Sequence, residues 1–335
     1  MSHTTIAFFN SKGGVGKTSL VYHLAWMYRE LGLSVLAADF DPQANLTSAF
    51  LDDGRLEELW PDRGHARTVF GALEPLLRGV GAVALTHVEQ LEDGLHLIPG
   101  DLALSSFEDE LNRQWPACLD GQERAFRVIS AFWRIIQAAA AQTAADLVLI
   151  DLGPNLGAIN RATLIATDYV VVPLAPDLFS LQGLRNLGPT LRRWRQEWNE
   201  RLSKNPDPEE LDLPPGSLAL AGYVILQRAV RLDRPVRGYA RWIERIPEVY
   251  QTAVLGGEAK HVAPIPDDPH CLDLVKDYRS LMPLAQEAKK PMFLLRPADG
   301  AIGAHGEAVL AAYRDFERLA RQIAQRTSVR VPERV

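Results

Sequence analysis

The chain has little cysteine, no long apolar run and no excess of positive charge. Cys118 and Cys271 are the only cysteines among its 335 residues, too few for a disulfide framework or a four-thiolate metal site. Apolar runs such as Tyr169 to Val172 stay well below the ~20 residues that cross a bilayer. The opening MSHTTIAFFN lacks a basic segment followed by a long apolar one. We therefore expect a cytoplasmic protein without a membrane anchor.

The charge balance limits how the protein could contact nucleic acid. The 36 Lys and Arg stand against 42 Asp and Glu, which gives a formal net charge of -6. Such a chain does not offer its whole surface to nucleic acid, so any contact with DNA must use a local basic patch. A hydrophobic share of 47% and a charged share of 23% are typical of a folded globular chain and exclude a disordered one.

Six short apolar runs alternate with segments of helical periodicity, and most of them end at Asp, Pro or Gln. They cover residues 5–9, 34–38, 95–98, 147–150, 169–172 and 218–226. Short apolar strands separated by helices predict a parallel sheet that is buried on both faces, with ligand groups at the carboxyl ends of the strands. We therefore predict the α/β class, with a single doubly wound, mostly parallel sheet flanked by helices.

The remaining segments are interpreted as additions to one domain over residues 1–335. Polar insertions are expected at about 51–93, 112–122 and 199–216, and the last of these holds four prolines and five carboxylates. A C-terminal helix is expected over about 307–326. Its apolar residues favour packing on the core over membrane anchoring, and they are Val309, Tyr313, Phe316, Leu319 and Ile323.

A glycine-rich loop, SKGGVGKTS, joins the first strand to the first helix. Its glycines allow backbone N–H groups to surround phosphate oxygens, and the helix that follows points its positive end at the same anion. Lys17 is expected to reach the β- and γ-phosphates, and the Thr18 hydroxyl to bind Mg²⁺. The alternative, a plain glycine turn before a helix, does not account for the lysines and the threonine. The predicted cofactor-binding residues of the loop are Gly13, Gly14, Val15, Gly16, Lys17, Thr18 and Ser19.

Ser11 stands where the strict phosphate-loop pattern has glycine, and Lys12 is an additional lysine. In this deviant loop the sequence resembles the ParA/MinD branch of P-loop ATPases, and the extent of the match favours the ParA side. The resemblance implies a P-loop NTPase fold of the SIMIBI, deviant Walker A type. It continues through DFDPQANLTS (39–48), LHLIPGDLALSSFEDEL (95–111), the Walker B and switch segment (147–187) and KKPMF (289–293).

The resemblance also implies roles for single residues. Lys12 would reach across a nucleotide-sandwich dimer and act in trans; the alternative is a solvated loop lysine. Asp41 would orient the attacking water, so Lys12, Lys17 and Asp41 are the predicted catalytic residues. Thr18, Asp39 and Asp151 are the predicted metal residues, although aspartates at strand ends are also common as structural caps.

The switch segment departs from the family pattern, in which two consecutive prolines are usual. In DLGPN, Gly153 stands in the first of these positions and Pro154 in the second. Gly153 permits backbone angles that proline forbids, so we expect this segment to be more mobile. For the adenine base the family fold suggests Gln227, Pro264 and Pro266. A GTPase-type Asn-Lys-x-Asp sequence is absent, which favours ATP over GTP.

A strip of arginines follows the strand at 218–226. Its spacing of four residues from 237 to 245 predicts one stripe on a helix, suited to phosphates without base reading. The alternative is a solvated helix face with ordinary ion pairs. The predicted DNA-binding residues are Arg228, Arg231, Arg234, Arg237, Arg241 and Arg245, and a second cluster contains Arg185, Arg192, Arg193 and Arg195.

The resemblance, together with the arginine strip, implies a ParA-like Mg-ATPase that forms a homodimer on ATP, binds non-specific DNA of the nucleoid and positions a plasmid, chromosome or other cargo. Weak intrinsic hydrolysis would be stimulated by a ParB-like or cargo adaptor protein. Only nine residues precede Asn10, so we expect no operator-binding arm. The alternative is a nucleotide switch without DNA binding that regulates a secretion, polysaccharide or defence assembly.

Overall fold

A computed structural model describes residues 3–62, 64–226, 241–259, 262–278 and 280–332. Within them, eight strands form one sheet in the order β3-β4-β2-β5-β1-β6-β7-β8. Neighbouring strands are parallel except at the β3–β4 edge. The prediction of a doubly wound, mostly parallel sheet is confirmed. The strands are β1 (Thr4–Phe8), β2 (Val35–Asp39), β3 (Glu89–Glu92), β4 (Leu95–Ile98), β5 (Leu147–Asp151), β6 (Tyr169–Leu174), β7 (Ala219–Leu226) and β8 (Cys271–Val275).

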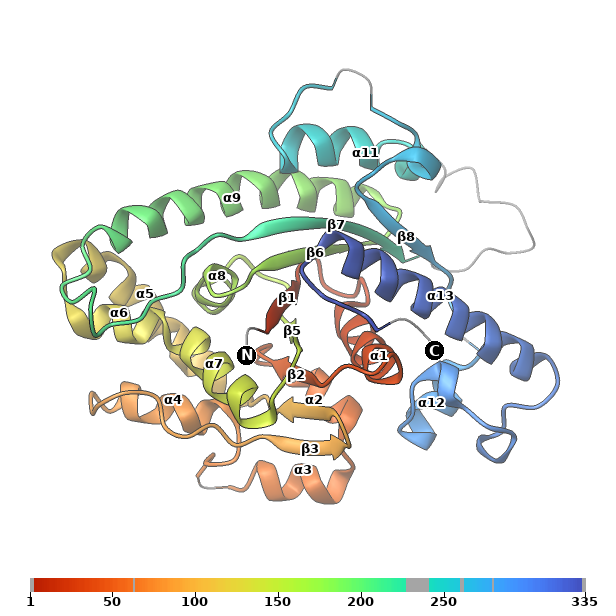
Figure 1. Ribbon diagram of the computed structural model, residues 1–335, viewed down its shortest axis with the longest axis horizontal. Helices are drawn as coiled ribbons and strands as arrows, with labels where there is room; N and C mark the ends of the chain where they lie inside the picture. Colours follow the sequence, from red (N-terminus) through yellow and green to blue (C-terminus); the bar gives the residue numbers. More distant parts are fainter. Residues whose placement is uncertain (1–2, 63, 227–240, 260–261, 279, 333–335) are drawn as a thin grey trace.

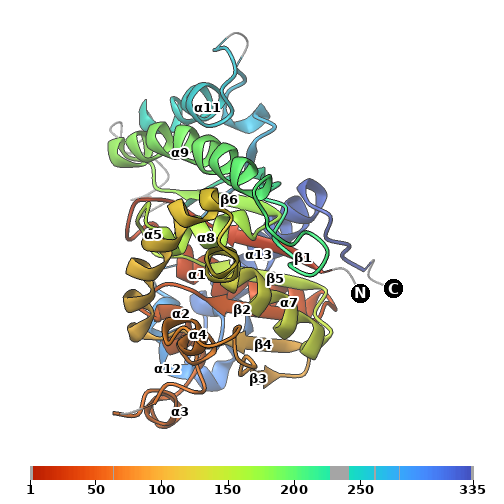
Figure 2. The ribbon, with the colours of Figure 1, turned by 90° about the vertical axis from the view of Figure 1, so that its left-hand side faces the viewer.

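Helices cover both faces of the sheet because the central strands are apolar on both sides. All residues of β1, β2 and β5 are buried, and each large aliphatic side chain so buried contributes about 1.5–3 kcal/mol. One layer lies to the right of the sheet in Figure 1 and contains α1 (Lys17–Glu30), α2 (Asn45–Phe50), α12 (Met282–Ala288) and α13 (Ala304–Arg326). Figure 2 looks onto the second layer, which contains α4 (Val69–Leu77), α5 (Phe107–Ala117), α6 (Glu123–Ile129), α7 (Ala131–Thr143), α8 (Ala158–Ile165) and α9 (Leu178–Leu202).

The C-terminal helix packs on the sheet layer through the expected face. It begins at Ala304, three residues before the expected start, and ends at Arg326 as expected. Phe316, Leu319 and Ile323 are buried in the core between this helix, α1 and the sheet. The Tyr28 hydroxyl donates to the Ala320 carbonyl at 2.8 Å.

The polar segments differ in structure. Residues 51–93 contain α3 (Asp53–Leu59), α4 and the antiparallel strand β3, an edge strand that the sequence did not predict. Residues 112–117 complete α5 and are not a peripheral insertion, because Trp115 and Cys118 continue its buried stripe despite the polar neighbours. Residues 203–218 form neither helix nor strand.

No helix in the described part of the chain has the length and apolar character needed to cross a membrane.

Candidate active site

The glycine loop lies at the edge of the sheet where parallel strands end. Phe8 of β1 and Asp39 of β2 both pair in register with Asp151 of β5, so the ends of three strands meet below the loop. Gly16 has a φ of 88°, and a Cβ there would come within 2.8 Å of Leu226 Cδ1. The loop therefore requires glycine at this position both for its backbone angle and for its contact with β7.

Lys17 points its ammonium back into the loop. Its Nζ donates to the carbonyls of Asn10 at 3.2 Å and Lys12 at 3.3 Å. Burial lowers the pKa of Lys17, and the charges of Asp151 and Asp41 oppose that shift. Gly13 and Gly14 are exposed above it. A buried cation below an exposed glycine loop at the start of a helix is suited to an anion with several oxygens.

Thr18 and Asp151 form a direct pair. The Thr18 hydroxyl donates to Asp151 Oδ2 at 2.6 Å. Asp151 is fully buried, and its Oδ1 has no hydrogen-bond partner among the residues that the structure describes. Burial, with a further contribution from the charge of Asp39, raises the pKa of Asp151 to about 8. A buried carboxylate oxygen of this kind is suited to a cation.

Asp39 is engaged by the protein itself. Its Oδ2 accepts hydrogen bonds from the Thr47 N–H at 2.8 Å and the Thr47 hydroxyl at 2.7 Å. Thr47 Oγ1 in turn accepts from the Gly100 N–H at 2.7 Å. Burial raises the pKa of Asp39 to about 7, and its hydrogen bonds with Thr47 oppose that shift. These bonds join β2, α2 and the end of β4, and the role of Asp39 near the metal stays a prediction.

Asp41 lies beside the switch segment. Only 6% of its surface is exposed, and its Oδ1 accepts from the Gln43 N–H at 3.0 Å. A Cβ at Gly153 would come within 3.2 Å of the same Oδ1. Gly153 therefore allows the backbone to approach Asp41 closely. This contact is a structural consequence of the missing proline that was not anticipated from the sequence.

Lys12 is paired within its own chain. Its Nζ forms an ion pair with Asp177, and it lies 5.9 Å from the centre of the Phe179 ring. Asp177 also caps α9, because its Oδ1 accepts from the Ser180 N–H at 2.9 Å. Sequence reasoning missed Asp177, although an aspartate between the end of a strand and an apolar helical segment is an N-cap pattern that could have found it.

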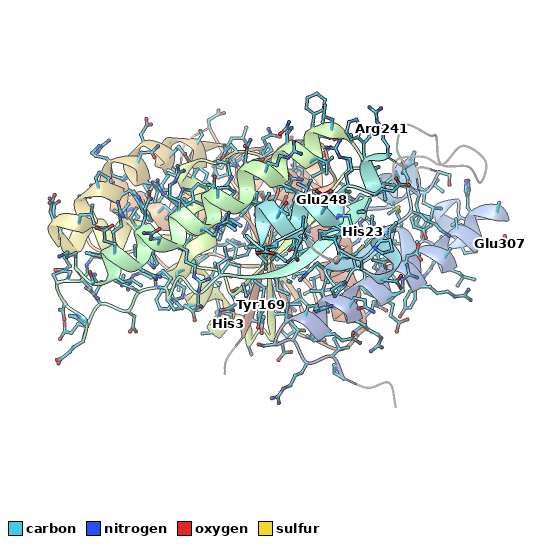
Figure 3. All side chains as sticks on the ribbon, turned by 90° about the horizontal axis from the view of Figure 1, so that it is seen from above. His3, His23, Tyr169, Arg241, Glu248 and Glu307 are labelled. Atoms are coloured by element: carbon cyan, nitrogen blue, oxygen red, sulfur yellow. The ribbon has the colours of Figure 1, made fainter. Side chains whose placement is uncertain are left out.

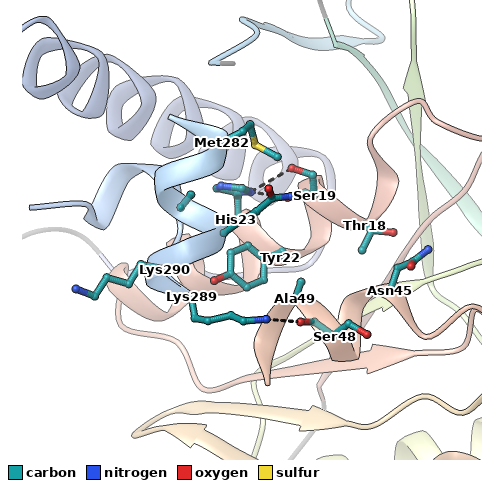
Figure 4. A pocket seen from close by; sticks show the side chains of 12 residues that line it. Thr18, Ser19, Tyr22, His23, Asn45, Ser48, Ala49, Met282, Lys289 and Lys290 are labelled. Atoms are coloured by element: carbon teal, nitrogen blue, oxygen red, sulfur yellow. Dashed lines mark hydrogen bonds between the residues drawn. The ribbon is translucent and has the colours of Figure 1, made fainter. Parts of the chain in front are cut away.

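Two hollows flank the first turn of α1. One, of about 250 Å³, is lined by Gly14, Gly16, Leu226 and the segment 275–278 at the ends of β7 and β8. The other, of about 460 Å³, lies between α1, α2 and α12 (Figure 4), where the Lys289 ammonium donates to the Ser48 carbonyl at 2.9 Å.

His23 lies beside the larger hollow and connects α1 to the KKPMF segment. Its Nδ1 lies 2.6 Å from the Ser19 carbonyl, and its Nε2 accepts from the Met292 N–H at 3.2 Å. These two bonds are compatible with a neutral ring that carries its proton on Nδ1. Burial lowers the pKa of His23 to about 4.

The residues suggested for the base are only partly placed at the site. Pro264 and Pro266 precede β8, whereas the hollow beside the glycine loop lies at the carboxyl end of that strand, where 275–278 follow. We therefore do not carry the two prolines into the site. Gln227 lies outside the described residues.

The arginine strip is described in its last part only, since Arg228, Arg231, Arg234 and Arg237 lie outside the described residues. Arg241 and Arg245 are exposed, and their guanidinium carbons lie 4.2 and 5.5 Å from the Trp242 ring centre. Arg241 lies at the periphery of the view in Figure 3. A turn at 244–245 interrupts the helix, so the two arginines do not continue one straight helical stripe.

The second arginine cluster is exposed along α9. Arg192 donates to the Ala253 and Val254 carbonyls at 3.2 and 2.7 Å, which ties it to the neighbouring segment. Arg193 lies 3.8 Å from Glu197. The exposed arginines of α9 are Arg185, Arg192, Arg193 and Arg195.

Comparison with known proteins identifies the family and the fold. A family model described as an AAA domain matches residues 3–204, more than half of the chain. The chromosome partitioning protein ParA of Caulobacter vibrioides is 34% identical over 197 residues, which cover 59% of this chain and 65% of that protein. The chromosome-partitioning ATPase Soj of Thermus thermophilus is 33% identical over 199 residues, with the same shares of 59% and 65%. The match spans just under two thirds of the length of these relatives.

Solved structures extend the likeness to nearly the whole chain. The protein DIP2308 from Corynebacterium diphtheriae has a TM-score of 0.68 at 26% identity, covering 96% of this chain and 98% of that one. A putative plasmid partition protein from Borrelia burgdorferi, solved with bound AMPPNP, has a TM-score of 0.57 at 16% identity over 97% and 99% and shares the fold. With the deviant glycine loop in place at the carboxyl edge of the sheet, these matches establish that the chain belongs to the ParA family of P-loop ATPases.

Proposed function

We propose that the chain is a Mg-ATPase of the partition type. ATP binding would join two copies into a dimer, the dimer would bind DNA without sequence preference, and a partner protein on a plasmid, chromosome or other cargo would trigger hydrolysis and release. The observation that carries the proposal is the meeting of Lys17, Thr18, Asp41 and Asp151 around one glycine loop. The partitioning roles named for the Caulobacter and Thermus relatives support the cellular setting.

The proposed position of ATP follows from the loop and the smaller hollow. The N–H groups of residues 13–19 and the Lys17 ammonium would hold the phosphates. The base would enter the hollow at the ends of β7 and β8, because its lining includes Gly14 and Gly16, whereas the larger hollow contacts no glycine of the loop.

The residues fit Mg²⁺. The unpartnered Oδ1 of Asp151 and the adjacent Thr18 hydroxyl are oxygen donors of the kind that this ion prefers, and Mg²⁺ commonly keeps several waters. In the described part of the chain no three His, Cys, Asp or Glu side chains form a metal cluster, so phosphate oxygens and water would complete the coordination. The ion supplies charge neutralisation on the phosphates.

Hydrolysis would depend on Asp41 and the two lysines. Asp41 is nearly buried next to Gly153, where its carboxylate would orient the attacking water and hold it away from bulk solvent. Lys17 would stabilise the charge that develops on the transferred phosphoryl group. Lys12 would add a second positive charge from the opposite copy, as an arginine finger does in comparable enzymes.

The dimer proposal is supported by apolar side chains near the loop. Phe179 is 71% exposed, Leu178 42% and Leu156 37%, and all three follow strands that end at the catalytic edge. A second copy covering this edge would remove them from water. Lys12 would then release Asp177 of its own chain and contact the phosphates bound by the opposite copy.

DNA binding would use the exposed arginines of 241–245 and α9. The phosphates of the DNA backbone attract arginines whatever the base sequence. Each arginine–phosphate contact makes the affinity more dependent on salt. An acidic protein with a local cluster of arginines fits this mode of binding.

The experiment is an electrophoretic mobility shift with ATP at several salt concentrations. Arg241→Glu and Arg245→Glu should weaken binding and lower the salt slope by about 1 each, whereas Arg78→Glu, on the exposed end of α4, should behave as the wild type. DNA binding that does not change with ATP, with salt or with either charge reversal would exclude the DNA step and favour a regulator that acts through protein contacts.

The role of Lys12 has a separate test. Lys12→Ala should abolish the stimulated part of hydrolysis, and full stimulation in that variant would exclude its role in trans.

A further inference from the structure

The segment after Asp151 is held from behind by Asn160 of α8. Asn160 Nδ2 lies 2.9 Å from the Gly153 carbonyl, 2.7 Å from the Asn155 carbonyl and 2.8 Å from Asn155 Oδ1. Asn160 is 1% exposed. One buried amide thus binds both ends of the Gly153–Asn155 turn. The mobility expected from the missing proline is opposed by these bonds.

Glu108 of α5 holds the same segment at its other end. Its Oε2 accepts from the Ile159 N–H at 2.9 Å, and its Oε1 accepts from the Ala158 N–H. Both donors lie in the first turn of α8, where N–H groups lack partners within the helix and a negative charge is stabilised by the helix dipole. Glu108 therefore fixes where α8 begins and where the switch segment ends.

Gly157 makes this approach possible. A Cβ at Gly157 would lie 2.4 Å from Glu108 Oε1 and 3.0 Å from Asn155 Oδ1. Its φ of -84° is open to any residue. Glycine is required here for space and not for backbone angle, so a methyl group at 157 must displace the Glu108 carboxylate.

The held segment lies between the two parts of the proposed site. Gly153 lies against Asp41 Oδ1, and a Cβ at Gly13 of the glycine loop would contact Pro154 Cγ at 3.7 Å. A shift of the segment would therefore change the surroundings of the water that Asp41 is proposed to orient. It would leave Lys17 and Thr18, which belong to the loop and α1, in place.

We infer that Glu108 and Asn160 are positioning residues for hydrolysis: they hold Gly153 and Pro154 against Asp41 and the glycine loop without contacting nucleotide. The inference rests on the proposed ATPase function. The inference predicts that turnover depends on these two residues and that nucleotide affinity does not. A misplacement of about 1 Å in a site of this kind lowers turnover by roughly 100-fold.

The test compares Glu108→Ala with Asp109→Ala, an exposed carboxylate on the same helix. For each protein, the dissociation constant of a fluorescent ATP analogue with Mg²⁺ and the turnover number for ATP are measured. Glu108→Ala should lower turnover by roughly 10- to 100-fold and change the dissociation constant by less than about threefold. Asp109→Ala should match the wild type. Glu108→Gln, which keeps an acceptor oxygen, should recover part of the turnover, and amide exchange in 152–159 should be faster in Glu108→Ala.

Gly157→Ala provides an independent test, because it should act by displacing Glu108. Alone it should lower turnover as Glu108→Ala does, and the double variant should be no worse than either single one. Additive losses would show that Gly157 does not act through Glu108 and would overturn this step. Asn160→Asp, of equal size but without the Nδ2 donors, should reproduce the loss of turnover and decides the question if Glu108→Ala does not fold.

The outcomes distinguish the inference from the function on which it rests. A wild-type protein that binds no ATP or never hydrolyses it would defeat the proposed function. A wild-type protein that hydrolyses ATP, with unchanged turnover in Glu108→Ala and Asn160→Asp, would overturn only the positioning role. An equal loss of affinity and turnover would also overturn it, because the segment would then be part of binding.

Discussion

The site has two halves that are built differently. The half proposed to bind ATP comes from one continuous stretch, residues 13–19, with Asp151 as its distant partner. The half proposed to hydrolyse it combines Asp41, the switch segment and Lys12. Glu108 of α5 and Asn160 of α8 hold the switch segment, and Asp177 at the start of α9 pairs with Lys12. Binding should therefore tolerate distant changes, whereas turnover should not.

The largest expected effect tests the hydrolytic half alone. Asp41→Ala removes the carboxylate that would orient the attacking water, and turnover should fall by roughly 10²- to 10⁴-fold. Affinity for ATP should remain, so an ATP-bound dimer should accumulate and elute earlier from a sizing column. Full turnover in this variant would remove Asp41 from the proposed mechanism. Asp62→Ala, an exposed aspartate outside the site, serves as control.

The next effect tests the binding half. Lys17→Ala removes the buried ammonium below the glycine loop, and affinity for ATP should fall by roughly 10²- to 10³-fold, since an unpaired charge contact of this kind costs about 2–5 kcal/mol. Calorimetric titration with Mg-ATP measures it. Lys290→Ala, at a lysine paired with Asp299 on the rim of the larger hollow, should bind ATP as the wild type does. Equal affinities for both variants would contradict the proposed position of the phosphates.

A third prediction concerns the stability of the helix that carries the binding half. Burial lowers the pKa of His23 from 6.5 to about 4, so between these values the unfolded chain binds more protons than the folded one. The free energy of unfolding should rise with pH across this window, and His23 should contribute about 3 kcal/mol to the rise. This contribution should be lost on acidification. Urea unfolding from pH 4 to 7.5 measures the slope. In His23→Gln the slope should fall by the amount that corresponds to the uptake of one proton on unfolding. An unchanged slope would show that His23 is not the group responsible.

The smallest expected effect concerns the pairing of Lys12. Asp177→Asn keeps an acceptor for the Ser180 N–H but removes the charge that holds the ammonium. Because a partly exposed ion pair contributes about 0.2–1 kcal/mol, ATP-dependent dimerisation should become about two- to fivefold stronger. Analytical ultracentrifugation with and without ATP measures this change. Weaker dimerisation in the variant would indicate that Asp177 assists Lys12 and does not compete for it.

The sequence predicted the fold and the binding half because both follow from local patterns. Apolar runs identified six of the eight described strands to within one or two residues, and SKGGVGKTS identified the loop. It missed both edge strands, β3 and β8. The EQLE sequence of β3 has little β-propensity and is stabilised by pairing with β4, and β8 pairs only with β7. It also took residues 112–122 for a polar insertion, although 112–117 complete α5, because their polar composition hid the buried stripe that contains Trp115.

In the site, the family resemblance implied that Asp39 is a metal residue, and this role stays a prediction. The structure engages its Oδ2 with Thr47, eight residues along the chain, and this pairing has no signal in spacing. The two prolines suggested for the base lie before β8, whereas the hollow beside the glycine loop lies where that strand ends.

By itself the sequence determined which residues are apolar in strands and which form the glycine loop, since these depend on neighbours along the chain. Only the tertiary structure decided which distant side chains hold the catalytic segments: Asp177 on Lys12, Asn160 on Gly153 and Glu108 on α8. Such contacts join residues separated by 165, 7 and 51 positions. They depend on how the layers pack, because a hydrogen bond requires its two atoms to meet within about 3 Å whatever their distance in sequence.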